Sequence, residues 1–174
     1  IIDMGAFHAY DIRGIWNVDF DRETAYKVAY FLPELLATDK VAVGRDCRVS
    51  SDEIHQAVLQ GITDAGADVY DLGLTTTPAV YFATANYGFK ASVQITASHN
   101  GPQYNGMKVS TENARAVGYD AGLKTIKQWI DEGKPTPAAE TKGQVHQMNI
   151  YKDYLDFLLK YKEDYSNLNI AMDL

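Results

Sequence analysis

The chain has 174 residues, of which 46% are hydrophobic and 22% are charged, a balance typical of a folded domain and not of a disordered segment. Its formal net charge of -7 repels phosphate backbones and anionic membrane surfaces, and no apolar run reaches membrane-spanning length, so we expect neither nucleic acid nor a membrane as a partner. The single cysteine, Cys47, excludes an intramolecular disulfide and favours a reducing, cytoplasmic location.

Short apolar runs rich in β-branched residues alternate with amphipathic stretches, which is the pattern of an α/β fold. The predicted order is β-α-β-α-β-α-β-loop-β-α, and it forms a three-layer α/β/α domain with a mixed, mostly parallel sheet. Strands are predicted at residues 41–43, 69–72 and 91–96. A further strand at residues 107–110 is expected to run antiparallel, because only a short loop separates it from the strand before it.

Capping residues predict where the first three helices begin. Asp21 is expected to cap the first helix, and Pro33 to bend or shorten it. Ser50 and Glu53 have the spacing of a capping box at the start of the second helix. The pair Thr77–Pro78 is expected to supply the N-cap and the first position of the third helix.

The last third of the chain has a different composition. Residues 120–132 predict a helix that ends before Gly133, and residues 150–159 predict another. Residues 168–174 are expected to begin an apolar strand that the chain end interrupts. We predict a first domain at residues 1–134, a linker rich in proline and small residues at 135–148, and the truncated start of a second domain at 149–174.

A polar loop with Ser98 and His99 follows the strand at residues 91–96, where α/β folds place their sites. Neighbouring residues of an extended chain point to opposite faces, so we expect His99 to be poorly placed to deprotonate Ser98. The sequence contains no nucleophile-elbow, P-loop or dinucleotide-binding glycine motif. A serine that carries a phosphoryl group needs cations to neutralise its charge, and the candidates are Arg13, Arg45, Arg48 and Lys108.

Each candidate also has a purely structural interpretation. The serine could satisfy an ordinary turn, the histidine could only position the loop, and the lysine could be a solvent-exposed strand residue. Arg13 could form a surface ion pair with Asp11 or Asp46. Arg45 and Asp46 are expected to have a structural role and to brace the loop after their strand.

Five short motifs occur in order along the chain and together resemble the α-D-phosphohexomutases, the phosphoglucomutase and phosphomannomutase family. They are Tyr10-Asp11-Ile12-Arg13-Gly14, Val43-Gly44-Arg45-Asp46, Thr76-Thr77-Pro78, Thr96-Ala97-Ser98-His99-Asn100 and Tyr104-Asn105-Gly106-Met107-Lys108. The resemblance extends from Phe7 to Leu174. It implies an isomerase that transfers a phosphoryl group between positions 1 and 6 of a hexose phosphate, through a phosphoserine and a bisphosphate intermediate.

The resemblance also implies roles for individual residues. Ser98 is the phosphoserine and, through its phosphate, a magnesium ligand, while a hexose 1,6-bisphosphate serves as the activator. Arg13 approaches the phosphoserine, Lys108 acts as a general acid or base, and His99 lies beside the nucleophile. One departure is Gly101, because family members usually have proline after the Ser-His-Asn triplet and glycine gives the backbone more conformational freedom.

Three motifs of the family do not occur in these 174 residues: the Asp-Gly-Asp-Gly-Asp-Arg magnesium loop, the sugar-specificity loop and the C-terminal phosphate-binding loop. The resemblance therefore implies that the isolated chain is inactive and that C-terminal domains of the same polypeptide complete the site. The sequence leaves open which sugar phosphate is the substrate. It also leaves open a non-catalytic role as a phosphosugar-binding or interaction domain.

Overall fold

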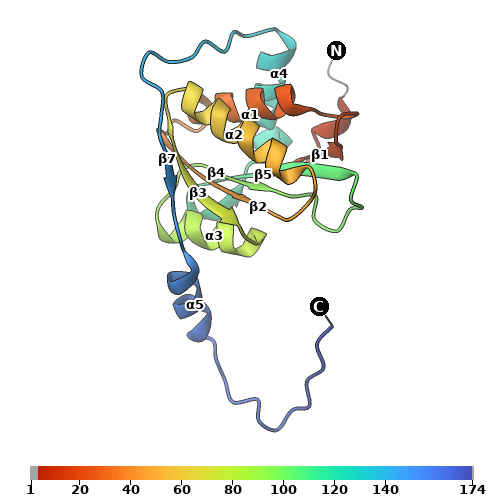
Figure 1. Cartoon of the computed structure of the whole chain (residues 1–174), viewed down its shortest axis with the longest axis vertical. Coiled ribbons are helices and arrows are strands. Elements are labelled where there is room, and N and C mark those ends of the chain that lie inside the picture. Colours follow the sequence, from red (N-terminus) through yellow and green to blue (C-terminus); the bar gives the residue numbers. More distant parts are fainter. Residues whose placement is uncertain (1–3, 174) are drawn as a thin grey trace.

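A computed structural model describes residues 4–173 of the chain, and Figure 1 shows its ribbon. The strands are β1 (Ile12–Ile15), β2 (Lys40–Arg45), β3 (Asp68–Leu74), β4 (Ser92–Ile95), β5 (Tyr104–Thr111), β6 (Arg115–Ala116) and β7 (Val145–Gln147). The helices are α1 (Arg22–Leu35), α2 (Ser51–Asp64), α3 (Thr77–Asn86), α4 (Lys124–Asp131) and α5 (Tyr151–Leu159). This order confirms the predicted alternation of strands and helices. None of the helices in the described range is long and apolar enough to cross a membrane.

The described strands form one mixed sheet in the order β1-β5-β4-β2-β3-β7, with β6 beside β5. β2 pairs in parallel with β3 and β4, and β3 pairs in parallel with β7. β5 runs antiparallel to both β4 and β1. The predicted reversal of chain direction between β4 and β5 is therefore confirmed. Parallel neighbours need a crossing segment over the sheet, whereas a short loop is enough for this reversal.

The sheet lies between two layers of helices. Figure 1 shows α1, α2 and α4 on one face of the sheet and α3 on the other. Val93 and Ile95 of β4 are fully buried and belong to the large core that also contains the apolar residues of α1 and α2. Ser92 points to the opposite face, where its hydroxyl accepts a hydrogen bond from Thr84 Oγ1 of α3 at 2.7 Å. The predicted three-layer α/β/α arrangement is confirmed.

Two helix starts test the capping predictions. The cap of α1 is confirmed, because Asp21 Oδ1 accepts a hydrogen bond from the Thr24 N–H at 2.9 Å. Pro33 lies inside α1, close to the C-terminal end of the helix. The capping box of α2 is wrong, since the Ser50 side chain makes no cap bond. Its hydroxyl instead accepts a hydrogen bond from Asn105 Nδ2 of β5 at 2.9 Å, so a tertiary contact replaces the local one.

The third and fourth helices begin a few residues away from their predicted starts. Thr76, and not Thr77, is the N-cap of α3. The helix predicted at residues 120–132 opens with a π-type turn over Tyr119–Leu123, in which Gly122 leaves the helical conformation. α4 follows this turn, so the helical hydrophobic spacing correctly locates the helix but not its first turn.

The stretch predicted as a linker, residues 135–148, lies along the domain and contains β7. Its Ala139 N–H donates a hydrogen bond to the main-chain carbonyl of Asp64 at the end of α2, with a distance of 2.8 Å. β7 then adds an edge strand to the sheet beside β3. We call residues 135–147 the strap. The division of the chain into a domain at 1–134, a linker and a second domain stays a prediction.

Three aspartates between the end of α2 and the middle of β3 hold the strap through their side chains. These contacts are Asp64 Oδ1 to Lys142 Nζ at 2.7 Å, Asp68 Oδ1 to the Gln144 N–H at 2.8 Å, and Asp71 Oδ2 to Gln147 Nε2 at 3.1 Å. Burial opposes ionisation of Asp64 and Asp71, but the hydrogen bonds and nearby charges outweigh burial and lower the pKa of both carboxyls. The Gln144 N–H is the largest cause that lowers the pKa of Asp68.

We expect these carboxylates to make the protein unstable in acid. A carboxyl whose pKa falls on folding contributes stability above its unfolded pKa of about 4 and loses that contribution as the pH falls through its folded pKa. Asp71, which is buried and also lies 2.9 Å from His55 Nε2, is the best position to test. Asp71→Asn should lower the free energy of unfolding by about 1–2 kcal/mol near neutral pH. It should also weaken the loss of stability below about pH 4, which denaturant titrations followed by circular dichroism measure.

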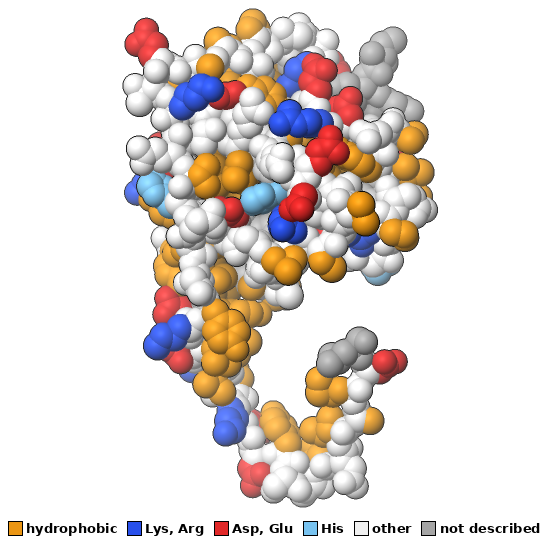
Figure 2. All heavy atoms as spheres, viewed as in Figure 1, with side chains coloured by type: hydrophobic (Ala, Val, Ile, Leu, Met, Phe, Trp, Pro, Cys, Tyr) orange, Lys and Arg blue, Asp and Glu red, His pale blue; other side chains and the backbone are white. Residues whose placement is uncertain are grey.

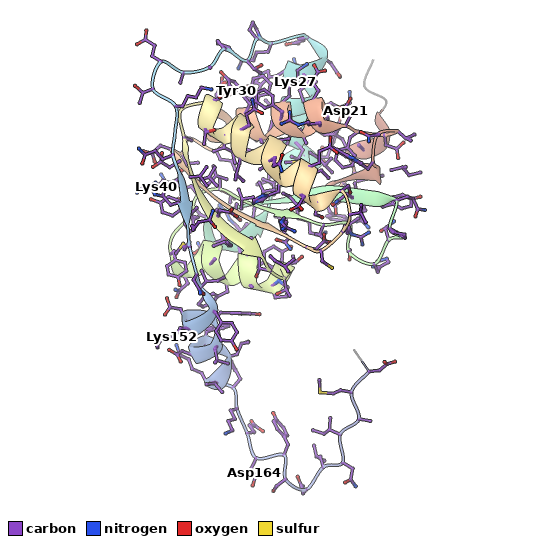
Figure 3. The ribbon with its side chains drawn as sticks, in the orientation of Figure 1. Asp21, Lys27, Tyr30, Lys40, Lys152 and Asp164 are labelled. Atoms are coloured by element: carbon purple, nitrogen blue, oxygen red, sulfur yellow. The ribbon has the colours of Figure 1, made fainter. Side chains whose placement is uncertain are left out.

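Asp164 provides the matched control. Its pKa is also lowered, by the Ser166 N–H, but it is exposed in the segment after α5, where Figure 3 labels it. Because solvent screens an exposed group, Asp164→Asn should change the free energy of unfolding and its pH dependence far less than Asp71→Asn does. If Asp71→Asn keeps the pH dependence of the parent protein, the carboxylates that hold the strap do not determine the acid limit.

α5 packs against α3 through aromatic side chains. The ring of Phe82 on α3 has its centroid 5.2 Å from that of Tyr154 and 5.1 Å from that of Phe157. Tyr87 Oη donates a hydrogen bond to Asp153 Oδ2 at 2.5 Å, and burial together with this carboxylate raises the pKa of Tyr87 to about 12. Figure 2 shows hydrophobic side chains exposed over α5 and the segment that follows it.

The strand predicted at residues 168–174 does not form in the part that the structure describes. Residues 168–173 have no strand conformation, and Leu174 lies outside the described residues. Leu168, Ile170 and Met172 are 56%, 66% and 75% exposed. A strand needs a neighbour for its main-chain hydrogen bonds, and the described sheet places none of its strands beside this segment.

Candidate functional site

Ser98 lies in the loop that joins β4 to β5, beyond the C-terminal end of β4. Its φ of 57° is in the left-handed region, which costs a residue other than glycine on the order of 1–3 kcal/mol. The Ser98 N–H donates to Thr96 Oγ1 at 3.0 Å, and the Ser98 carbonyl accepts from Arg48 Nη2 at 2.7 Å. Main-chain contacts therefore hold an unfavourable turn, while the residue itself is exposed.

His99 lies beside the Ser98 hydroxyl, and not on the opposite face where extended backbone would place it. Its Nδ1 is 3.3 Å from Ser98 Oγ. The expectation assumed extended backbone, in which neighbouring side chains face opposite ways. The left-handed conformation of Ser98 brings the two side chains to the same side. Because this separation is long for a hydrogen bond from a hydroxyl, the contact is better suited to orient Ser98 than to deprotonate it.

Arg13 of β1 and Lys108 of β5 converge on one buried carboxylate. Arg13 Nη2 and Lys108 Nζ lie 3.0 and 2.9 Å from Asp11 Oδ2, and the Asp11 side chain is only 2% exposed. Arg13 Nη1 also donates to Asn100 Oδ1 at 3.0 Å, which connects β1 to the Ser98 loop. The strand register explains the convergence: Arg13 is opposite Gly106, and Gly106 and Lys108 are two residues apart, so both cations lie on the same face of the sheet.

A cleft of about 600 Å³ adjoins this group of charges. Its volume is within the range of sites that bind small molecules. Arg13 and Asn100 contribute a guanidinium and an amide to its wall, and Tyr104 and Asp19 also line it. Asp19 Oδ2 already accepts a hydrogen bond from the Ile15 N–H at 2.6 Å. The cleft can therefore offer Arg13 to an anionic ligand close to the Ser98 loop.

Arg45 and Asp46, which follow each other at the end of β2, bind different partners. Arg45 Nη2 lies 2.9 Å from Asp52 Oδ1 on α2, and Arg45 reaches Asp46 only through the main-chain carbonyl, at 3.3 Å. The Asp46 carboxylate instead binds Arg48 Nε at 3.1 Å and accepts from Ser51 Oγ at 2.6 Å. Neighbouring side chains diverge at the end of a strand, so Arg45 and Asp46 find different partners.

Arg48, one of the four candidate cations, contacts the Ser98 loop at several points. Besides the Ser98 carbonyl, its Nη1 donates to the carbonyls of Gly101 and Tyr104 at 2.8 and 3.2 Å. The signal in the sequence is the Asp-x-Arg spacing of Asp46 and Arg48, directly after a buried strand. A carboxylate two residues from an arginine can fix the guanidinium, but the sequence does not show which loop the guanidinium meets.

The described residues do not provide a complete magnesium site of the kind that the resemblance implies. Magnesium takes oxygen ligands in octahedral geometry, commonly from carboxylates. Among residues 4–173 there is no group of three or more His, Cys, Asp and Glu side chains that could hold a metal ion. Asp11 and Asp46, the carboxylates of this site, are paired with Lys108 and Arg48.

Comparisons with known proteins agree on one family. Residues 4–136 match the profile of phosphoglucomutase/phosphomannomutase, alpha/beta/alpha domain I. A phosphomannomutase from Escherichia coli is 38% identical over 159 residues, which cover 91% of this chain and 35% of that protein. A phosphomannomutase from Klebsiella pneumoniae is 38% identical over 154 residues, which cover 88% of this chain and 98% of that protein.

Solved structures give the same result. The crystal structure of a phosphoglucomutase/phosphomannomutase family protein from Burkholderia thailandensis is similar, with a TM-score of 0.79 and 30% identity. The similarity covers 92% of this chain and 36% of that one. This chain thus spans about a third of the length of the Escherichia coli and Burkholderia relatives.

Proposed function

Because the chain belongs to the phosphoglucomutase/phosphomannomutase family, we propose that it is the N-terminal portion of a phosphohexomutase. The reaction is the reversible transfer of a phosphoryl group between positions 1 and 6 of a hexose phosphate, through phosphorylated Ser98 and a bisphosphate intermediate. The observation that carries the proposal is the conformation of Ser98, an exposed serine held in a left-handed turn of a loop that Arg13 also contacts through Asn100.

The chemistry of phosphoryl transfer fits this group of residues. Such transfer depends on positioning and on fixed positive charge more than on a strong base. When the phosphoserine reacts, the bond between phosphorus and Ser98 Oγ breaks and a bond between phosphorus and a sugar oxygen forms. The proton of that sugar hydroxyl must leave, and Lys108 is its proposed acceptor and, in the reverse reaction, its donor.

Arg13 and His99 have positioning roles in this proposal. The Arg13 guanidinium can bind phosphate oxygens with fixed geometry, and Asp11 holds Arg13 and Lys108 in place from one buried oxygen. His99 orients the Ser98 hydroxyl through its 3.3 Å contact. Both side chains are therefore fixed in the region that a doubly charged phosphate has to enter.

The proposal includes Mg²⁺ and a hexose 1,6-bisphosphate activator. The Ser98 phosphate would be one magnesium ligand, and missing C-terminal domains of the same polypeptide would supply the others. Bound Mg²⁺ would add positive charge beside the phosphate oxygens. The free cysteine Cys47 favours a cytoplasmic enzyme, and the net charge of -7 disfavours nucleic acid and anionic membranes as partners. The proposed partner is a sugar phosphate, held by local cations such as Arg13.

Residues 1–174 alone should show no measurable mutase turnover. The carboxylates of the described site are already paired, so the chain cannot by itself assemble the metal and distal phosphate contacts on which the rate depends. A coupled assay with hexose 1-phosphates measures this, with the full-length protein as the positive control. Normal turnover by residues 1–174 would contradict the expected division of the site between domains.

A further inference from the structure

Arg48 uses its guanidinium almost completely on the loop that carries Ser98. Nε donates once, to Asp46 Oδ2; Nη1 donates twice, to the Gly101 and Tyr104 carbonyls; and Nη2 donates once, to the Ser98 carbonyl. These bonds occupy four of the five N–H groups of a guanidinium. The side chain is 13% exposed. Arg48 thus joins both ends of the loop to one planar group.

The loop needs such an external contact because its own sequence does little to fix it. Ser98 has a φ of 57°, a conformation that a serine leaves readily when nothing holds it. Gly101 adds a residue with wide conformational freedom in the middle of the loop. Arg48 binds the carbonyl of Gly101 itself and one carbonyl on each side of it, those of Ser98 and Tyr104. The guanidinium therefore limits the backbone movement that the glycine would otherwise allow.

Arg48 is itself held from the domain core. The Asp46 carboxylate binds Arg48 Nε at 3.1 Å and the Arg48 N–H at 3.2 Å, and it accepts from Ser51 Oγ at 2.6 Å. The fully buried Asn105 at the start of β5 donates to the hydroxyls of Ser50 and Ser51 at 2.9 and 3.0 Å. A continuous chain of hydrogen bonds therefore connects β5 and the start of α2 to the guanidinium.

We propose that Arg48 is a positioning residue that keeps Ser98 in the reactive left-handed turn, an inference whose catalytic consequence rests on the proposed function. Arg48 is not a phosphate ligand, because its donors are directed at main-chain carbonyls and only one N–H remains free. It acts on the reaction through the backbone of Ser98. Lysine cannot replace it, since an ammonium has three donors and no planar fork with which to bridge three carbonyls and a carboxylate.

The first experiment measures the loop itself and needs no turnover. Amide hydrogen exchange followed by mass spectrometry compares this chain with Arg48→Ala and Arg48→Lys. The amides of Ser98, Asn100 and Tyr104 are hydrogen-bonded within the loop, and we expect them to exchange about tenfold faster in both variants. Peptides from β2 and β3 should keep their exchange rates, which separates a loosened loop from a destabilised domain.

Arg45→Ala is the matched control. Arg45 is three residues from Arg48 and also forms an ion pair with an aspartate, but its partner Asp52 is 72% exposed, so the pair contributes little. Arg45 makes no hydrogen bond to the loop at residues 98–104 among the described contacts. Its variant should keep the exchange rates of the parent protein.

The second experiment measures kcat and KM in the full-length protein. Misplacing a nucleophile by about an ångström lowers kcat about 100-fold, while substrate binding by other residues leaves KM within about twofold. We expect Arg48→Ala to show this division, and Arg48→Lys to recover less than about a tenth of the lost kcat. Guanidinium chloride at about 20 mM should raise kcat of Arg48→Ala several-fold by supplying the missing planar donors, whereas sodium chloride at the same concentration should not.

The outcomes separate the two proposals. If the loop amides keep their exchange rates in both Arg48 variants, Arg48 does not hold the loop and the inference is wrong. If exchange accelerates but the full-length parent protein shows no mutase turnover, the proposed function fails while the structural role of Arg48 stands. If the parent is active and Arg48→Ala changes KM but not kcat, Arg48 contacts substrate and is not a positioning residue. Should Arg48→Ala loosen β2 and β3 as well, the comparison rests on Arg48→Lys.

Discussion

Ser98→Ala is expected to abolish phosphoenzyme formation in the full-length protein and to reduce turnover below detection. The alanine variant has no oxygen that can accept a phosphoryl group at this position. The Ser98 side chain is exposed, and its loop is bound to Arg13 through Asn100. Another serine could take the position of Ser98 only if its main-chain segment moved. A lost nucleophile usually costs on the order of 10⁴-fold or more in rate. Intact-mass analysis after incubation with hexose 1,6-bisphosphate, followed by peptide mapping, measures the bound phosphate.

Ser110→Ala is the control for this experiment. Ser110 is 2% exposed in β5, where it is opposite Ser92 of β4, so a phosphoryl group cannot reach it without disrupting the sheet. This variant should form phosphoenzyme like the parent protein. Stable phosphate on another residue of the parent would contradict the assignment of Ser98. If the parent binds a hexose phosphate and never becomes phosphorylated, the chain is better described as a phosphosugar-binding domain.

The sequence predicts much of this fold because local and tertiary preferences agree along most of it. Strand β4 alternates polar and apolar residues, and all four are buried, as expected of a central strand whose two faces are both covered. The polar loop after β4 is too short for a crossover, so it dictates the antiparallel direction of β5. Asp21 caps α1 as expected, since its partner Thr24 is only three residues away.

The errors arise where a residue has a choice between a local and a distant partner. Ser50 has the spacing for a capping box but accepts a hydrogen bond from Asn105, which is 55 residues away. Spacing in the sequence ranks the local partner first, and only the packed structure shows that the distant partner also satisfies a buried polar group.

In the candidate site, too, the sequence does not show every partner of a side chain. Sequence motifs place Ser98, Arg13 and Lys108 in the site, but not the carboxylate that joins the two cations. Asp11 reaches both because β1 is beside β5 in the sheet. This close approach depends on Gly106, where a Cβ would lie 2.1 Å from the Ile12 carbonyl oxygen.

In the last third of the chain, strand formation depends on whether the sheet offers a neighbouring edge. β7 forms because β3 offers it an edge, whereas residues 168–173 have no such edge beside them and form no strand.

Arg13→Ala and Lys108→Ala should affect the full-length enzyme in different ways, although both cations lie about 3 Å from the same oxygen of Asp11. A guanidinium that only binds phosphate oxygens stays charged over the whole accessible pH range. Arg13→Ala should therefore lower kcat about 10²- to 10³-fold, the usual cost of losing one fixed electrostatic contact in the transition state. The shape of its pH–rate profile should match that of the parent.

Lys108→Ala should lower kcat by about 10²- to 10⁴-fold. It should also remove or displace one limb of the pH–rate profile, because the rate depends on the protonation state of a residue that exchanges a proton with the sugar hydroxyl. Lys27→Ala is the matched lysine control. Lys27 pairs with exposed Glu23 on α1, where Figure 3 labels it, and its variant should change neither rate nor profile. Chemistry has to limit kcat for the limb to be visible, so single-turnover rates from phosphoenzyme are the measurement to use. If Arg13→Ala and Lys108→Ala both give profiles parallel to the parent, Lys108 is a positioning charge like Arg13, and the proton of the sugar hydroxyl goes to a group that another part of the protein supplies.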